Sequence, residues 1–140
     1  WESAMEFQIN RMGYNEHRWL DSGDVPNVQF LASVCEIARQ TPNVMHWLPT
    51  REVKTLLAFI KQYGADHIPS NLNIRVSAPM VNDKPLSAFD NMPQITTSTV
   101  HDKHNAPQGH SCPARNQGNA CGDCRACWNS KVANVSYPIH

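Results

Sequence analysis

The sequence lacks a net charge, a long apolar run and the common nucleotide-binding and hydrolase motifs. Twelve basic and twelve acidic side chains cancel, which removes the electrostatic basis for general nucleic-acid binding. No apolar stretch approaches the roughly 20 residues that cross a bilayer. The chain also contains no P-loop, no dinucleotide fingerprint and no G-x-S-x-G motif. We therefore expect neither a nucleic-acid partner nor a membrane, and no nucleophile–base pair is evident.

The chain begins Trp1-Glu2-Ser3, without a hydrophobic leader and without an initiator methionine. Clustered thiols without a secretory segment indicate a reducing cytoplasm, where structural disulfides do not persist. The missing methionine leaves room for further residues upstream. The 140 residues, 41% of them apolar, suit one domain spanning residues 1–140.

Four of the five cysteines lie close together near the C-terminus, in the pattern C-x8-C-x2-C-x2-C. The C-x2-C-x2-C part is the core of the bacterial ferredoxin run, in which successive sulfurs turn towards one cluster. Gly122 permits a positive φ in that turn. Pro113 follows the first cysteine, as a proline follows the remote ligand in ferredoxins. We expect a 4Fe–4S cluster in a loop at 112–127, held by Cys112, Cys121, Cys124 and Cys127.

Zinc is the main alternative, because it also takes four thiolates, although its usual knuckles are two separated C-x2-C pairs. Disulfides suit small secreted domains, which this chain does not resemble. Cys35 lies apart from the others on the apolar face of a predicted helix, so we expect it to pack in the core.

Hydrophobic periodicity predicts alternating strands and helices. Gly13 and Gly64 are expected to end helices, and Pro138 suggests that the last strand lies at an edge. We expect Val53, Leu56, Leu57 and Ile60 to face the core. Helices are expected at 1–12, 27–40 and 51–63; strands at 17–22, 44–48, 72–77, 94–100 and 132–139; and loops at 78–94 and 101–110.

Arg18, His46 and Arg75 recur at spacings of 28 and 29 residues, the length of one strand–helix unit. Such units require parallel strands. The predicted fold is therefore α/β: a curved, mostly parallel sheet of repeated strand–helix units, a partial β/α barrel, with the cysteine loop at its C-terminal end. The few units that fit in this length cannot close eight strands.

Ligands of parallel α/β folds bind beyond the carboxyl ends of the strands, and we place the cysteine loop at that rim. Four arginines there are expected either to offset the charge of a cluster or to bind an anionic ligand. The alternative is that they form structural ion pairs with nearby carboxylates such as Asp21, Asp24 and Glu52. The four are Arg18, Arg51, Arg75 and Arg125.

Three histidines precede the cysteines, but four thiolates already complete a ligand set. We interpret His101, His104 and His110 as solvated loop residues, and His46 as a hydrogen-bonded core residue. Trp128 follows the last cysteine, where it either shields a cluster from water or packs in the core.

Four stretches carry a resemblance to a known family: Arg18–Asp24, His46–Glu52, Arg75–Met80 and Cys121–Trp128. Together they resemble the phage-encoded family named gene product 88, from about His17 to the end. The resemblance implies a phage origin and an iron–sulfur site, and no settled activity. A looser similarity is to radical S-adenosylmethionine enzymes, which join a partial barrel to a 4Fe–4S cluster, but their C-x3-C-x2-C motif differs in spacing, position and number of ligands.

These observations lead to three functional hypotheses. The first is a phage-encoded 4Fe–4S protein of the host cytoplasm, with an electron-transfer or redox role and a redox partner protein. The second is an enzyme that acts on a small anionic substrate beside the cluster, at the arginine-lined rim. The third is a zinc-stabilised interaction module.

Overall fold

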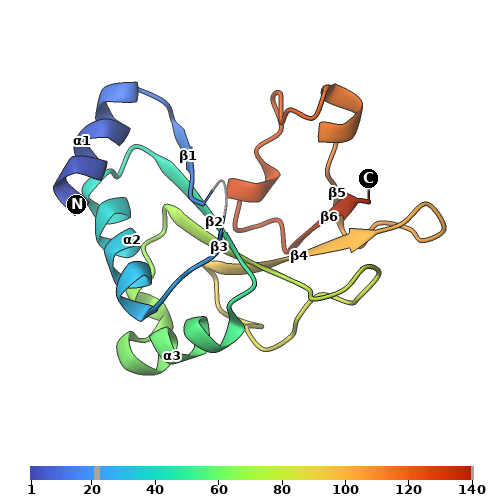
Figure 1. The fold of residues 1–140 in the computed structure, drawn as a ribbon, viewed down its shortest axis with the longest axis horizontal. Helices are drawn as coiled ribbons and strands as arrows, with labels where there is room; N and C mark the ends of the chain where they lie inside the picture. The colour runs from blue at the N-terminus through green and yellow to red at the C-terminus, as the bar shows by residue number, and fades with distance from the viewer. Residues whose placement is uncertain (21–22, 140) are drawn as a thin grey trace.

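The structure is a computed structural model that describes residues 1–20 and 23–139. Its three α-helices alternate with the first three of its six strands over residues 2–77, and no α-helix separates the later strands within the described residues 78–139 (Figure 1). The helices are α1 (Glu2–Met12), α2 (Val28–Gln40) and α3 (Val53–Tyr63). The strands are β1 (Glu16–Arg18), β2 (Met45–Thr50), β3 (Leu72–Ser77), β4 (Ile95–His101), β5 (His110–Ser111) and β6 (Asn134–Pro138). Three short 3₁₀ turns are η1 (Ala65–His67), η2 (Ala114–Gln117) and η3 (Ala126–Trp128).

The strands form one six-stranded sheet in the order β1-β2-β3-β4-β6-β5, and every neighbouring pair is parallel. The sheet curls into half of a barrel, as the periodic strand–helix pattern predicts (Figure 1). The helices α1, α2 and α3 cover its outer face. The cysteine loop, residues 112–127, lies over the opposite, concave face (orange to red in Figure 1).

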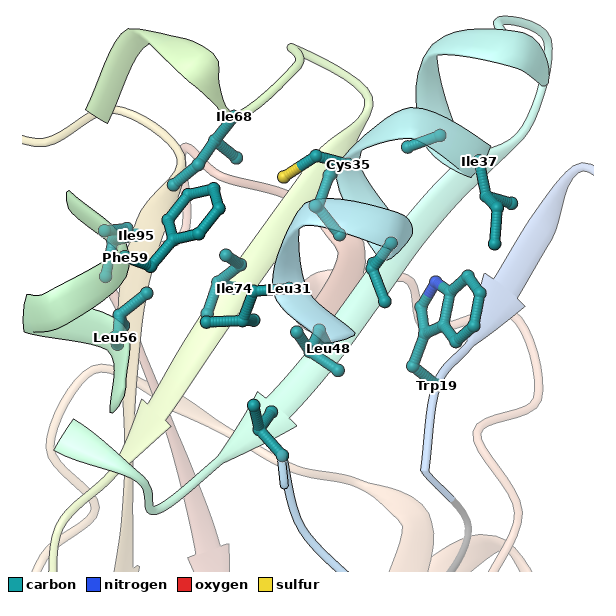
Figure 2. Close-up of a cluster of buried hydrophobic side chains, with 14 of the residues drawn as sticks. Trp19, Leu31, Cys35, Ile37, Leu48, Leu56, Phe59, Ile68, Ile74 and Ile95 are labelled. Atoms are coloured by element: carbon teal, nitrogen blue, oxygen red, sulfur yellow. The ribbon is translucent and has the colours of Figure 1, made fainter. Parts of the chain in front are cut away.

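The main core lies between the helices and the outer face of the sheet (Figure 2). Helix α2 begins where predicted, because the Asn27 side chain accepts a hydrogen bond from the Phe30 N–H at 2.8 Å. Cys35 is fully buried in this core, which confirms its predicted packing role. Burial raises the pKa of its thiol to about 12.

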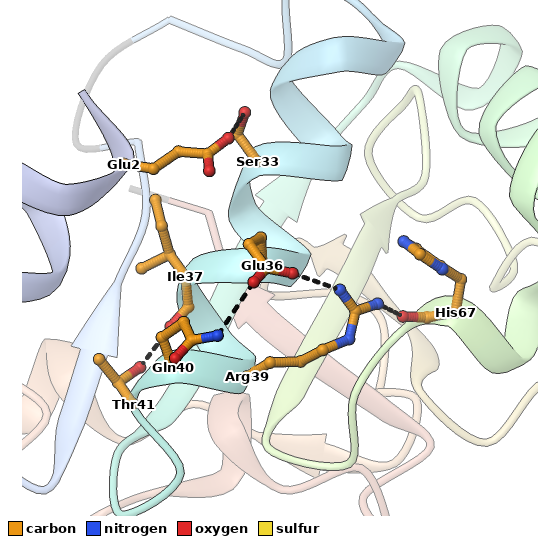
Figure 3. A network of polar contacts seen from close by, with 8 residues as sticks. All are labelled: Glu2, Ser33, Glu36, Ile37, Arg39, Gln40, Thr41 and His67. Atoms are coloured by element: carbon orange, nitrogen blue, oxygen red, sulfur yellow. Dashed lines mark hydrogen bonds and ion pairs between the residues drawn. The ribbon is translucent and has the colours of Figure 1, made fainter.

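The exposed side of α2 carries a polar network that ties neighbouring elements to the helix (Figure 3). Ser33 donates to the Glu2 carboxylate of α1 at 2.6 Å. Arg39 forms an ion pair with Glu36 at 3.1 Å and also donates to the backbone carbonyl of His67 in η1. These contacts link α1, α2 and the turn after α3.

Helix α3 differs from the prediction at its start and on its buried face. Pro49 and Thr50 continue strand β2 instead of leaving it, because Thr50 pairs with Val76 in the sheet. The helix therefore begins at Val53, with Glu52 as its N-cap. Phe59 is buried, whereas Leu57 is 43% exposed. The prediction for Leu57 was wrong because the face of the helix that packs in the core is the one with Leu56 and Phe59.

The last strand, β6, is an inner strand, so its predicted edge position was wrong. It lies between β4 and β5, and the two-residue β5 forms the edge. Pro138 is tolerated because it ends the strand, and the next residue, Ile139, donates to His101 at 2.9 Å.

Strand β3 has an apolar face towards the helices and a polar face towards the cysteine loop. Leu72, Ile74 and Val76 point into the helix-covered core, so the residues between them point to the concave face. Those residues are polar: Asn73 and Arg75 are buried and Ser77 is half-buried. The cysteine loop therefore packs on a buried polar surface.

Candidate metal centre

The cysteine loop runs from the edge of the sheet back to its centre. The Cys112 N–H donates to the Ser136 carbonyl of β6 at 2.9 Å, which fixes the start of the loop. Gly122 has φ +56, as the turn between the second and third cysteines requires. The Cys124 N–H donates to the Cys121 carbonyl at 3.0 Å and closes that turn. The loop ends in η3, which contains Cys127.

The four cysteines of the loop line one small cavity of about 10 Å³. Cys127 is buried, Cys112 and Cys124 are half-buried, and Cys121 is exposed. Within residues 1–20 and 23–139, no three His, Cys, Asp or Glu side chains are close enough together to hold one metal ion. The four thiols thus share a cavity without surrounding a single point.

This geometry allows the two metal alternatives to be compared. Zinc binds each sulfur at about 2.3 Å, which requires four sulfurs in mutual contact around one ion. In a 4Fe–4S cluster each thiolate binds a different iron, so the sulfurs are further apart. Four thiolates are a ligand set for either group, and the C-x2-C-x2-C spacing is more typical of a cluster than of two separated zinc knuckles. The cavity has room for one water molecule at most, so the loop in this conformation has no space for a cluster between the four cysteines.

Arg75 anchors the cysteine loop to the concave face. Its guanidinium is fully buried, and burial lowers its pKa from the ordinary arginine value. All its hydrogen bonds go to backbone carbonyls: Cys127 at 3.4 Å, Thr97 at 2.8 Å, Val132 at 3.1 Å, Ala126 at 3.0 Å and Asn129 at 3.2 Å. Arg75 thus places its charge directly behind Cys127 and supports the loop.

Asn73 and two aromatic residues complete the support of Cys127. The Asn73 amide donates to the Cys127 carbonyl at 2.8 Å. The Tyr137 hydroxyl lies 3.0 Å from the Cys127 sulfur. Burial raises the pKa of the Cys127 thiol, and the Tyr137 and Arg75 contacts oppose that rise. Trp128 packs edge-on against Trp47, with ring centres 5.2 Å apart, and closes the inner side of the site.

The remaining predicted arginines occupy three different environments. Arg125 forms an ion pair with Glu16 at 3.1 Å and donates to the Gly122 and Cys124 carbonyls, which ties the cysteine loop to β1. The Arg18 guanidinium lies 4.8 Å from the Trp47 ring centre. Arg51 is exposed, its backbone N–H donates to Asp24, and it lines neither cysteine cavity. The predicted partner Asp21 lies outside the described residues.

A larger cavity of about 530 Å³ adjoins the cysteines on the concave face. Cys112, Cys121 and Cys127 line it, whereas Cys124 does not. Arg18, Arg75 and Arg115 also line it, together with Ser77 and Ser98, whose hydroxyls are 2.9 Å apart. The cysteine sequence pattern gave no sign of Arg115, Asn73 or Tyr137; the polar positions alternating along β3 could have indicated Asn73.

The histidines follow the predictions in part. His46 is fully buried, accepts from the Trp19 indole at 3.0 Å and contacts the Thr41 hydroxyl at 2.8 Å, which confirms a hydrogen-bonded core residue. His101 was expected in a solvated loop, but it ends strand β4, and its Nδ1 atom lies 2.7 Å from the Ser136 hydroxyl. His110 is exposed, as expected, and its Nε2 atom lies 3.5 Å from the Cys124 sulfur. That contact arises because β5 places His110 two residues before Cys112.

The family model described as Gene product 88 matches residues 2–130. The protein belongs to this family. The match covers the whole sheet except β6, together with all four clustered cysteines, and the designation is of the kind used for bacteriophage gene products. No curated protein and no solved structure matches the chain. Among the described residues, no helix of this Gene product 88 member has the length and hydrophobicity needed to span a bilayer.

Proposed function

We propose that this Gene product 88 protein binds a 4Fe–4S cluster through Cys112, Cys121, Cys124 and Cys127, in the cytoplasm of a phage-infected cell. The observation that carries the proposal is that four cysteines from a 16-residue stretch, in the spacing C-x8-C-x2-C-x2-C, line one cavity. Such a cluster supplies one-electron chemistry at a potential that the surrounding hydrogen bonds and solvent exposure set.

The residues around the thiols suit a redox role. Arg75 and Arg125 place positive charge against the backbone of the cysteine loop, which suits the negative charge of a thiolate-bound cluster. Trp47 and Trp128 exclude water on the inner side. Cys121 and its neighbours at 115–123 are exposed, so a redox partner protein is expected to dock over this segment, where the path for an electron is shortest.

The test is reconstitution of the protein with iron and sulfide under anaerobic conditions. We expect about four irons per chain, as this cluster type contains, with broad visible absorption and a paramagnetic resonance signal after reduction. The Cys35→Ala variant is the matched control, because Cys35 lies in the helix-covered core, and its iron content should equal that of the parent. One zinc per chain and no colour would instead establish the zinc-stabilised interaction module.

A second candidate function is favoured by the larger cavity. An enzyme that acts on a small anion needs a cationic pocket beside its redox centre, and this cavity contains three arginines and three of the four thiols. The redox role above requires no such pocket.

A further inference from the structure

The 530 Å³ cavity on the concave face has an unusual charge balance. Among the described residues that line it, three are arginines and none is Asp or Glu. Its volume falls within the roughly 300–1,000 Å³ range of small-molecule sites. Cationic lining without carboxylates favours a negatively charged occupant.

The three arginines are not equivalent. The donors of Arg75 are directed to backbone carbonyls, so its side chain is occupied by the fold. Arg18 and Arg115 are both exposed, and neither forms an ion pair with a carboxylate of residues 1–20 or 23–139. One Arg115 nitrogen donates to the Ile139 carbonyl at 3.1 Å, which leaves further donors in its guanidinium. These two arginines are therefore the groups able to bind an anion.

A second observation concerns a donor left unpaired by the described residues, on a side chain of the same cavity wall. Trp47 lines the cavity and is 6% exposed. Its indole nitrogen is a buried side-chain donor for which the described part of the chain provides no hydrogen-bond partner. Buried donors are nearly always satisfied by protein, water or ligand. Arg18 stacks on the same ring, which holds its guanidinium at the wall of the cavity.

We propose that this cavity binds a small molecule through an oxyanion group, a carboxylate or a phosphate, held by Arg18 and Arg115. The rest of the ligand lies against the wall that contains Cys112, Cys121 and Cys127. The proposal names the ligand class of the second candidate function, and it rests on that function for the claim that the bound molecule is a substrate. Anion binding itself does not require a cluster.

The test is calorimetric titration of the purified full chain with inorganic phosphate and, separately, with citrate, at constant ionic strength. One of the two should bind saturably, and which one does decides between phosphate and carboxylate. Arg18→Gln and Arg115→Gln should each weaken that binding at least tenfold, because each removes a charged donor pair. Arg51→Gln is the matched control, and its affinity should equal that of the parent.

Three outcomes would overturn the proposal: no saturable binding of either probe, equal weakening by Arg51→Gln, or Arg18→Gln and Arg115→Gln variants that still bind like the parent. Iron content and the resonance spectrum are measured on the same samples. Anion binding by a protein that takes up no iron on anaerobic reconstitution would refute the cluster and keep the anion site. A cluster whose potential shifts in Arg18→Gln, without anion binding in the parent, would mean that these arginines serve only to offset cluster charge.

Discussion

Replacing Arg75 by methionine should show whether this buried arginine holds the cysteine loop. Hydrogen bonds from charged donors contribute about 1.5–3 kcal/mol each, and Arg75 makes five. Their sum overstates the loss, because some of the carbonyls keep another donor. Asn73 bonds the Cys127 carbonyl, the Asn129 N–H bonds that of Ala126, and the Val132 N–H bonds that of Asn129.

We therefore expect Arg75→Met to lower the free energy of unfolding by about 3–5 kcal/mol, because a buried carbonyl left without a donor costs about 1–3 kcal/mol. Urea unfolding followed by circular dichroism measures the loss. Arg51→Met, at an exposed position, should change stability by less than about 0.5 kcal/mol. The Arg75 variant should also take up less iron than the Arg51 variant. A loss below about 1 kcal/mol for Arg75→Met would refute its anchoring role.

Three further predictions follow from single positions. Burial, and next the charge of His17, lowers the pKa of His46 to about 4 from 6.5. As the pH falls, the unfolded chain takes up this proton before the folded chain does, so about 3 kcal/mol of stability should be lost between pH 6.5 and 4. Urea midpoints across this range should depend on pH much less in His46→Gln. Cys124→Ala should lose the cluster and most of the stability of the loaded protein, so an unchanged melting temperature would make the metal incidental to the fold. Gly109→Ala puts a Cβ 2.8 Å from the Asn134 carbonyl oxygen. Gly23→Ala is its control, because Gly23 has a similar positive φ but open space around it. In urea unfolding, Gly109→Ala should lower the free energy of unfolding by about 1–3 kcal/mol more than Gly23→Ala does.

Local signals explain which parts of the fold were predictable. Asn27 caps α2 with its own side chain, and Gly13 ends α1 in the left-handed region, so each boundary is determined by residues within one turn. Strand β5 has two residues and no periodicity to detect. Its presence is decided by β6, more than twenty residues later, and so the edge of the sheet could not be read from the sequence.

The candidate site was predictable in composition and not in its supports. The cysteine spacing placed four thiols together, and they do line one cavity. The four cysteines differ in exposure because each lies against a different part of the sheet or the loop, and the spacing of cysteines in the sequence does not determine those contacts. The Trp128 indole donates to the His17 carbonyl, 111 residues away, at 3.1 Å, and such a contact leaves no local pattern.

The polar positions of β3 account for how an irregular loop can be packed against the centre of a parallel sheet. A loop without regular pairing leaves backbone carbonyls that need donors once they are buried. Asn73 and Arg75 supply these donors from within the sheet, because alternate strand positions face the loop. A lysine could satisfy fewer carbonyls at once, since it lacks the planar fork. The same guanidinium places a positive charge beside Cys127, so the contact that orders the loop also opposes the rise that burial causes in the pKa of this thiol.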